Sequence, residues 1–291
     1  MNFLTDYKLP IGALSKGFVD WLTTNLDVLF NLIATILSAS INAMLFVLQG
    51  PFLKGTAFEP FYPLLMIALF SLFAWVMRRS IGVVVFTFLG LLLIYNQGYW
   101  KETMETLALV LAAAGVSMVI GVPIGIACAR RPWLYTAVRP VLDLMQTIPT
   151  FVYLIPALIL FGLGMVPGLI ATVIFAIPAP IRLTRLGIIS TPPSLVEAAV
   201  AFGATPSQVL RKVELPFATP QIMAGLTQTI MLSLSMVVIA ALVGASGLGV
   251  PVVRALNTVN IARGFEAGLC IVILAIILDR IFRIPGMGDD A

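Results

Sequence analysis

The sequence of 291 residues contains no histidine and only two cysteines. A serine or threonine nucleophile generally needs an adjacent base, so the absence of histidine argues against hydrolytic catalysis. Two well-separated cysteines without histidine do not form a transition-metal site either. The phosphate-binding motif Gly-x-x-x-x-Gly-Lys-Ser/Thr is also missing. We therefore expect no catalytic residue, no metal site and no cofactor bound by this chain.

Charged residues are scarce as well, at 10% of the chain, whereas hydrophobic residues make up 60% and the mean hydropathy is +1.07. A helix needs about 20 apolar residues to cross a bilayer, and eight apolar runs approach this length. We therefore predict an all-α polytopic membrane protein. Its eight predicted transmembrane helices lie near residues 28–49, 61–77, 81–97, 104–129, 138–163, 167–185, 221–244 and 265–283.

The distribution of basic residues predicts the orientation of these spans. If the N-terminus is cytoplasmic, 13 of the 17 Lys and Arg residues lie on the cytoplasmic side and four lie outside. Because Lys and Arg favour the cytoplasmic side, we expect both termini in the cytoplasm of a bacterial cell, with the chain in its inner (plasma) membrane. The basic residues lie at the ends of apolar runs, so the net charge of +4 does not indicate a nucleic-acid partner.

Three regions follow from this layout. Residues 1–27 form an N-terminal cytoplasmic or interfacial segment, in which residues 11–26 have the apolar spacing of an amphipathic helix lying on the membrane. Residues 28–100 carry the N-terminal transmembrane helices. Residues 101–291 carry the remaining five spans and a polar insert.

This polar insert, at about residues 190–217, is the longest one between apolar runs. Thr191-Pro192-Pro193 is predicted to end the preceding helix, because proline restricts the residue before it and donates no backbone hydrogen bond. Ser194 and Glu197 have the spacing of a capping box at the start of a short helix. Gly203 is predicted to end that helix in a left-handed conformation.

A second short helix is expected after this glycine. Thr205-Pro206-x-Gln208 combines a capping residue, a proline in the first turn and a second capping box, and Leu215-Pro216 is predicted to end the helix. Ala198 and Ala199 keep one face of the first helix small, so another protein can approach closely. The alternative is a well-capped surface hairpin without a partner.

The spacing Glu197-Ala198-Ala199, three residues, Gly203, nine residues, Val213-x-Leu215-Pro216 resembles the EAA loop of binding-protein-dependent ABC importer permeases, with Val213 in place of isoleucine. The resemblance covers roughly the last two-thirds of the chain and implies a five-helix permease core. It implies a separate ABC ATPase subunit that binds ATP and Mg²⁺, a periplasmic or extracellular substrate-binding protein, and a pair of permease chains, most simply a homodimer. The residues implied in ATPase coupling are Ser194, Glu197, Ala198, Ala199, Gly203, Ala204, Val213, Leu215 and Pro216.

Polar side chains on two predicted spans are candidates for a translocation path. Four of them follow at i, i+3, i+4 and i+7 on the fifth span, and polar groups inside a membrane usually face a cavity or a partner helix. Pro149 and Pro156 are expected to break the regular helix there, as happens where backbone lines a water-filled path. The alternative is that hydroxyls bond to their own backbone and that the carboxylate and amides bond between helices. The candidates are Asp143, Gln146, Thr147, Thr150, Phe151 and Tyr153 on the fifth span, and Gln228, Met231 and Ser235 on the seventh.

Small residues repeat every four positions along the fourth span, at Ala113, Ser117, Gly121, Gly125 and Ala129. Such a stripe lets two membrane helices approach closely. We therefore expect it to pack against another span and to have no chemical role.

Three segments, residues 145–156, 224–232 and 272–280, resemble the matching parts of permeases for quaternary-amine osmoprotectants. This resemblance implies choline, glycine betaine or proline betaine as the substrate, recognised by cation–π contacts that belong mainly to the binding protein. Phe151 and Tyr153 are candidates for a contribution from this chain. The alternatives are an ABC permease for an amino acid such as methionine, an ATP-independent carrier or channel, and a membrane enzyme.

Overall fold

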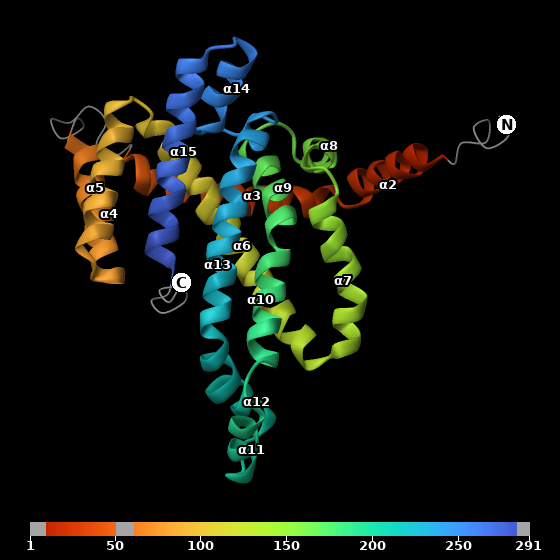
Figure 1. The fold of residues 1–291 in the computed structure, drawn as a ribbon. Coiled ribbons are helices and arrows are strands. Elements are labelled where there is room, and N and C mark those ends of the chain that lie inside the picture. Colours follow the sequence, from red (N-terminus) through yellow and green to blue (C-terminus); the bar gives the residue numbers. More distant parts are fainter. Residues whose placement is uncertain (1–9, 51–60, 284–291) are drawn as a thin grey trace, which may run out of the picture.

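In a computed structural model, which describes residues 10–50 and 61–283, the chain folds into a bundle of helices (Figure 1). Backbone hydrogen bonds inside a bilayer must be satisfied internally, and a helix does this within each segment. The elements are α2 (Ile11–Asn25), α3 (Asp27–Gln49), α4 (Tyr62–Arg78), α5 (Ile81–Asn96), α6 (Trp100–Arg130), α7 (Pro132–Thr147), α8 (Thr150–Phe161), α9 (Met165–Ala176), α10 (Pro178–Ile189), α11 (Pro193–Ala201), α12 (Pro206–Val209), the π-helix η3 (Leu210–Glu214), α13 (Leu215–Ala241), α14 (Gly249–Asn257) and α15 (Ile261–Phe282).

Within the described residues, five stretches are long and apolar enough to cross a membrane: α3, α6, α9 with α10, α12 through α13, and α15. The bent pair α7 and α8 makes a sixth if it counts as one span, and α4 and α5 are shorter apolar helices. The prediction of an all-α membrane protein is confirmed. The count of candidate spans, five or six, is lower than the eight expected.

The centre of the bundle is the contact between α6, α10 and α13. A methyl group on Gly125 of α6 would lie 2.7 Å from the Ile181 carbonyl oxygen and 2.7 Å from Thr184 Cβ, both in α10. Gly121 approaches α10 in the same way, and Ser117 is fully buried. The small-residue stripe is therefore confirmed as a packing face.

The hairpin of α4 and α5 packs against α15 through α5 at Gly90, where a methyl group would lie 2.8 Å from the side chain of Ile273. Side chains of α4, α5, α6, α13 and α15 also share one apolar core cluster, in which Ile67, Ile94 and Leu107 are almost fully buried. This cluster attaches the N-terminal helices to the rest of the bundle.

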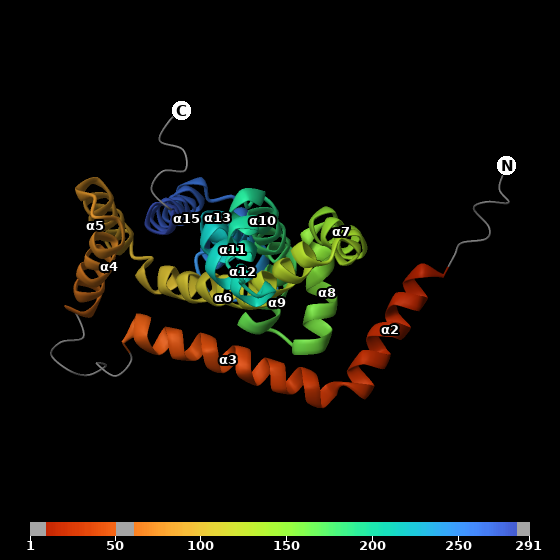
Figure 2. The ribbon, with the colours of Figure 1, turned by 90° about the horizontal axis from the view of Figure 1, so that it is seen from below.

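The helices α2 and α3 lie along the outside of the bundle. Both run across the direction of α10, α13 and α15 (Figures 1 and 2), and α3 packs against α6, α8 and α9. Only Ile41 and Leu48 of α3 are buried, whereas Val28 is 83% exposed. The predicted helices at 11–26 and 28–49 are confirmed as helices, but α3 does not stand parallel to the central spans.

The break expected at Pro149 within the fifth span, residues 138–163, is confirmed, whereas Pro156 lies inside α8 and does not break it. Helix α7 ends at Thr147, α8 begins at Thr150, and the two are bent by 97° at the break. Pro149 has no amide hydrogen to continue the helix, and it pushes the residue before it towards extended backbone. Ile148 accordingly has ψ of 131°.

Helix α14, which the sequence did not predict, lies at the end of the bundle opposite α11 and α12 (Figure 1). It follows a glycine-rich turn in which Gly244 has φ of +86° and Gly247 has φ of +126°. The turn is fixed by a buried hydrogen bond of 2.8 Å from the Leu248 amide to Thr106 Oγ1. A methyl group on Gly247 would lie 2.6 Å from this same oxygen, so the close approach requires glycine.

Candidate functional site

The polar insert forms a helical projection, here called the coupling segment, which comprises α11, α12 and η3 (Pro193–Glu214). It extends beyond the neighbouring spans at one end of the bundle (Figure 1). It therefore lies where a protein outside the membrane can reach it. This end is called the coupling end below.

The turn between α11 and α12 has the predicted left-handed glycine. Gly203 has φ of +78°, its amide donates to the Val200 carbonyl at 2.9 Å, and the Ala204 amide donates to the Ala199 carbonyl at 3.0 Å. No atom lies within 4 Å of the position that a Gly203 side chain would occupy. Glycine is therefore required here for its backbone conformation and not for lack of space.

Of the two predicted capping boxes, the second is confirmed. The Thr205 amide donates to Gln208 Oε1 at 2.8 Å, and the Gln208 amide donates to Thr205 Oγ1 at 3.4 Å. These bonds satisfy two amides that the first turn of a helix leaves unpaired. The pair thus fixes where α12 begins.

The first predicted capping box, between Ser194 and Glu197, is wrong. Helix α11 begins two residues earlier, with Pro192 at the capping position, Pro193 in the first turn and no side-chain cap. Proline is well suited to the first turn because its missing amide hydrogen has no partner there in any case. Glu197 is consequently an exposed carboxylate with no ion pair among the described residues. Ala198 follows it on the exposed side of α11.

An exposed apolar surface surrounds the turn. Phe202, which follows the last residue of α11, is 93% exposed, and Val200 is 57% exposed. Beside them lies a hollow of about 410 Å³ whose lining includes Ala199, Ala204 and Val213. Large apolar side chains on a projection outside the membrane are typical of a protein-protein contact.

The base of the coupling segment is held by an ion pair that sequence reasoning missed. Arg130 at the end of α6 donates to Glu214 Oε2 at 2.7 Å and to the Pro206 carbonyl at 3.3 Å. The Glu214 residue is only 8% exposed. Arginine at the end of one span and glutamate 84 positions later give no signal of this contact without the fold.

Leu215-Pro216 does not end the second short helix, contrary to the prediction. The π-helix η3 leads directly into α13, with Pro216 in its first turn. Proline lacks an amide hydrogen, and the wider π turn accommodates this loss without breaking the helix. Helix α12, η3 and α13 are therefore one continuous element, whereas the turn at Gly203 separates α11 from it.

The candidate path residues of the fifth span do not share one helix face. The bend places Asp143, Gln146 and Thr147 on α7, and it places Thr150, Phe151 and Tyr153 on α8. Asp143 is half exposed and accepts a hydrogen bond of 2.6 Å from Arg182 of α10, and its other oxygen lies 3.9 Å from Arg139. Asp143 thus forms an ion pair between helices, which is one of the alternatives considered from the sequence. Gln146 is partly buried beside it on α7.

The remaining candidates at the bend have local partners. Thr147 donates to the Leu144 carbonyl at 3.4 Å, and the Tyr153 hydroxyl donates to the same carbonyl at 3.1 Å. Tyr153 therefore joins α8 back to α7, while Phe151 is 56% exposed.

On α13, Gln228 and Ser235 are exposed and Met231 is partly buried on the same side of the helix. Gln228 and Met231 line a cavity of about 350 Å³ together with Asp279 and Arg283 of α15. Ser235 donates to the Met231 carbonyl at 3.1 Å, so its hydroxyl is satisfied by the preceding turn. Seen from the coupling end, α15 and α7 lie on opposite sides of α13 and α10 (Figure 2). A single chain therefore does not bring the two sets of candidates together.

Within residues 10–50 and 61–283, no group of three or more His, Cys, Asp or Glu side chains could hold a metal ion. Both cysteines are free and buried. The functional features of the described residues are therefore the coupling segment and the polar side chains of α7 and α13.

Comparisons with known proteins agree with this layout. The family described as "Binding-protein-dependent transport system inner membrane component" matches residues 121–284. The chain is 46% identical to the glycine betaine transport system permease protein OpuAB of Bacillus subtilis, over 94% of this chain and 93% of the relative. It is 50% identical to the glycine betaine/proline betaine permease protein ProW of Escherichia coli, over 76% of this chain and 62% of the relative.

Among solved structures, an inward-facing MetNI methionine ABC transporter matches 60% of this chain and 88% of its own, with a TM-score of 0.55 and 27% identity. The fold and these matches define the permease subunit of an ABC importer, which is a transporter component and not an enzyme. The chain belongs to the family of binding-protein-dependent transport system inner membrane components. Its place is the inner membrane, and the family name implies an ATPase and a substrate-binding protein as partners.

Proposed function

We propose that this chain is the permease subunit of an ATP-driven importer for quaternary amines of the glycine betaine class. The observation that carries the proposal is the identity of 46% and 44%, over 94% of this chain, with permeases named for glycine betaine and for glycine betaine and carnitine. A quaternary ammonium group cannot donate hydrogen bonds and is attracted by aromatic faces. Phe151 and Tyr153 offer such faces on α8, next to the bend.

The coupling segment is the proposed contact with the ATPase subunit. Three observations support this role: the segment projects beyond the spans, Phe202 is almost fully exposed, and Glu197 has no ion pair within the described residues. An exposed aromatic side chain beside a small hollow is the usual anchor of an interface. Closure of two ATPase subunits would displace the coupling segment. Because η3 continues into α13, this displacement would tilt α13 and move Gln228 with it.

Two copies of the chain are proposed to form the translocation path. Gln228 is exposed on α13, and an amide that faces lipid is costly, so a partner helix or an aqueous path is expected to cover it. One chain also carries one coupling segment, whereas an ABC transporter has two ATPase subunits. A homodimer would provide both a second chain to cover the polar face of α13 and a second coupling segment for the second ATPase subunit.

The proposed topology has eight crossings, with α4 and α5 as two short spans beside the six longer candidates, and both termini in the cytoplasm. The coupling end then lies in the cytoplasm with the ATPase and with Arg130, Arg182 and Arg185. The opposite end, with α14, faces the binding protein. The distribution of Lys and Arg supports this orientation.

Reconstitution in liposomes tests the function. The chain would be combined with its ATPase and binding protein, and uptake of labelled glycine betaine, choline and methionine would be measured with and without ATP. We expect ATP-dependent uptake of glycine betaine or choline. Uptake of methionine alone would favour the amino-acid alternative, and uptake undiminished without the ATPase would overturn the coupling mechanism.

Replacing Phe202 by alanine tests the docking surface. We expect the ATPase to dissociate more readily, because truncating an interface anchor typically costs about 2 kcal/mol of binding free energy or more. The matched control is Phe265→Ala, since Phe265 is also exposed, at 72%, but lies on α15 at the opposite end. Retention of the ATPase by Phe202→Ala to the same extent as by Phe265→Ala would exclude Phe202 from the interface.

A further inference from the structure

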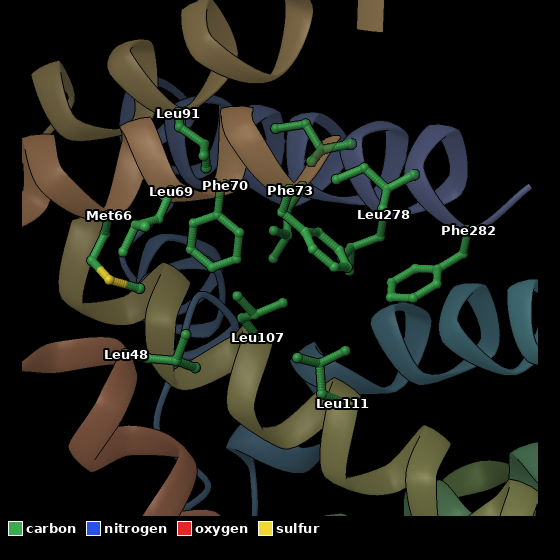
Figure 3. A pocket seen from close by; sticks show the side chains of 13 residues that line it. Leu48, Met66, Leu69, Phe70, Phe73, Leu91, Leu107, Leu111, Leu278 and Phe282 are labelled. Carbon is green, nitrogen blue, oxygen red and sulfur yellow. The ribbon is translucent and has the colours of Figure 1, made fainter. Parts of the chain in front are cut away.

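An apolar groove of about 350 Å³ lies between α4, α6 and α15 (Figure 3). Every side chain that lines it is Leu, Ile, Met or Phe; Leu69 and Phe73 come from α4, Leu107 and Leu111 from α6, and Leu278 from α15. Figure 3 shows these side chains directed into one shared space. Such a groove gives water no hydrogen-bond partner, and an empty one would forfeit dispersion contacts along its walls.

The groove opens towards the surrounding membrane. On α4, Leu65 is 53% exposed, Leu69 is 48% exposed and Leu72 is 58% exposed. In a membrane protein this surface contacts acyl chains. A hydrocarbon chain from the bilayer can therefore enter the groove beside Leu69.

One end of the groove has a basic rim. Phe73 and Phe282 pack edge to face there, with ring centres 6.5 Å apart. Just beyond this pair, the Arg78 guanidinium donates to the Arg283 carbonyl, which joins the ends of α4 and α15. The aromatic pair thus marks the boundary between the apolar groove and the charged rim.

Arginines end both helices that meet at this rim: Arg78 and Arg79 at the end of α4, and Arg280 and Arg283 at the end of α15. Arg79 and Arg280 are exposed. The Arg283 side chain lies 3.6 Å from Asp279, and both line the cavity beside Gln228 of α13. Helix α13 leads away from the coupling end and α15 returns towards it (Figure 1), so the rim lies on the same side of the membrane as the coupling segment.

We propose that the groove holds an acyl chain of an anionic phospholipid of the cytoplasmic leaflet, with its phosphate beside the exposed Arg79 and Arg280. Charge complementarity carries this choice of occupant, because the cytoplasmic leaflet is rich in anionic lipids and basic clusters beside membrane helices attract their headgroups. The leaflet assignment rests on the proposed topology. The bound lipid would add a contact between α4 and α15 to the packing of α5 on α15.

Native mass spectrometry of the intact importer tests this site. The complex would be titrated with phosphatidylglycerol and with phosphatidylcholine of the same acyl chains, and lipid retention would be compared. We expect tighter retention of phosphatidylglycerol by the wild type. The double variant Arg79→Gln with Arg280→Gln should lower this preference by about thirtyfold, because each basic residue near an anionic headgroup contributes about 1 kcal/mol.

The matched control is Arg131→Gln with Arg139→Gln, which removes two exposed arginines, one directly before α7 and one within it, across the bundle from α15 (Figure 2) and outside the coupling segment. It should keep the full preference. A third variant, Leu69→Trp, fills the groove and should reduce retention of both lipids while leaving all four arginines in place.

Equal retention of the two lipids by the wild type would overturn the proposal, as would an unchanged preference in the groove-rim double variant or unchanged retention in Leu69→Trp. Because lipid retention is read without transport, failure of the substrate assignment leaves this result unaffected. Conversely, equal retention of the two lipids by a wild-type importer that takes up glycine betaine normally would refute the lipid site alone.

Discussion

The Arg130 guanidinium and the Glu214 carboxylate are 2.7 Å apart, and they join the end of α6 to the base of the coupling segment. Arg130 also donates to the Pro206 carbonyl in α12, so one side chain contacts two parts of the segment. Glu214 is largely buried. A charge-assisted pair in such a place keeps two elements at a fixed distance. The pair therefore lets α6 and α13 move as one unit when the coupling segment is displaced.

Removing this pair should uncouple ATP hydrolysis from transport. Glu214→Ala leaves Arg130 without its carboxylate, and loss of a charged hydrogen bond costs about 2 kcal/mol, which is roughly a thirtyfold change in a local equilibrium. We expect uptake to fall several-fold while basal ATP hydrolysis continues. Uptake and hydrolysis would be measured in the same liposomes.

The exchange of both partners separates this effect from misfolding. Arg130→Glu combined with Glu214→Arg restores an ion pair of reversed polarity and should recover part of the uptake lost in Glu214→Ala. If the exchanged pair transports no better than Glu214→Ala and both variants fold, the ion pair has no role in coupling.

The backbone conformation of Gly203 gives a second prediction. An alanine in left-handed conformation is disfavoured by about 1–2 kcal/mol, and no neighbouring atom adds a clash. Gly203→Ala should therefore weaken ATPase association and uptake, whereas Gly203→Asn should do so less, since asparagine tolerates this conformation. ATPase co-purification measures the effect. Equal behaviour of the alanine and asparagine variants would show that the left-handed turn is not the cause.

The packing of α6 on α10 at Gly125 gives a third prediction. The methyl group of Gly125→Ala would meet a backbone carbonyl of α10 at 2.7 Å, and overpacking of this kind costs about 1–3 kcal/mol. We expect a lower thermal unfolding midpoint in detergent. Gly115→Ala is the matched control on the same helix, because nothing lies within 4 Å of that position, and it should leave the midpoint unchanged. Equal midpoints would refute the close contact.

Local sequence rules predicted the parts of the coupling segment that depend on neighbouring residues. The left-handed turn at Gly203 and the capping box of Thr205 with Gln208 are both set within four residues, so spacing alone predicted them. The capping box at Ser194 failed because two consecutive prolines start the helix two residues earlier, and proline in the first turn needs no side-chain cap.

The parts that sequence reasoning missed depend on contacts far apart in the chain. The pair of Arg130 with Glu214 joins α6 to η3, and that of Asp143 with Arg182 joins α7 to α10. The bend at Pro149 was predictable as a break in regular helix, but its angle of 97° was not. Helical periodicity continued across that break and therefore grouped Thr150 with residues of a different helix.

The topology gives a last prediction, because α3 has the length of a span but lies across the other helices (Figure 1). Single cysteines would be placed at exposed positions as Gly12→Cys, Ser80→Cys and Gln97→Cys and treated with a membrane-impermeant maleimide on intact cells. The native cysteines are buried and should react little. Gln97→Cys, between α5 and α6, should be labelled from outside, whereas Ser80→Cys, between α4 and α5, should be labelled only after permeabilisation.

Gly12→Cys decides the path of α3. If α3 crosses the bilayer at a strong tilt, Gly12 is cytoplasmic and its cysteine should also require permeabilisation, as the distribution of Lys and Arg predicts. Labelling of Gly12→Cys on intact cells would instead place the N-terminus outside and make α3 a helix that lies along the membrane. Labelling of Ser80→Cys from outside would invert the whole orientation, and it would separate the coupling segment from any cytoplasmic ATPase.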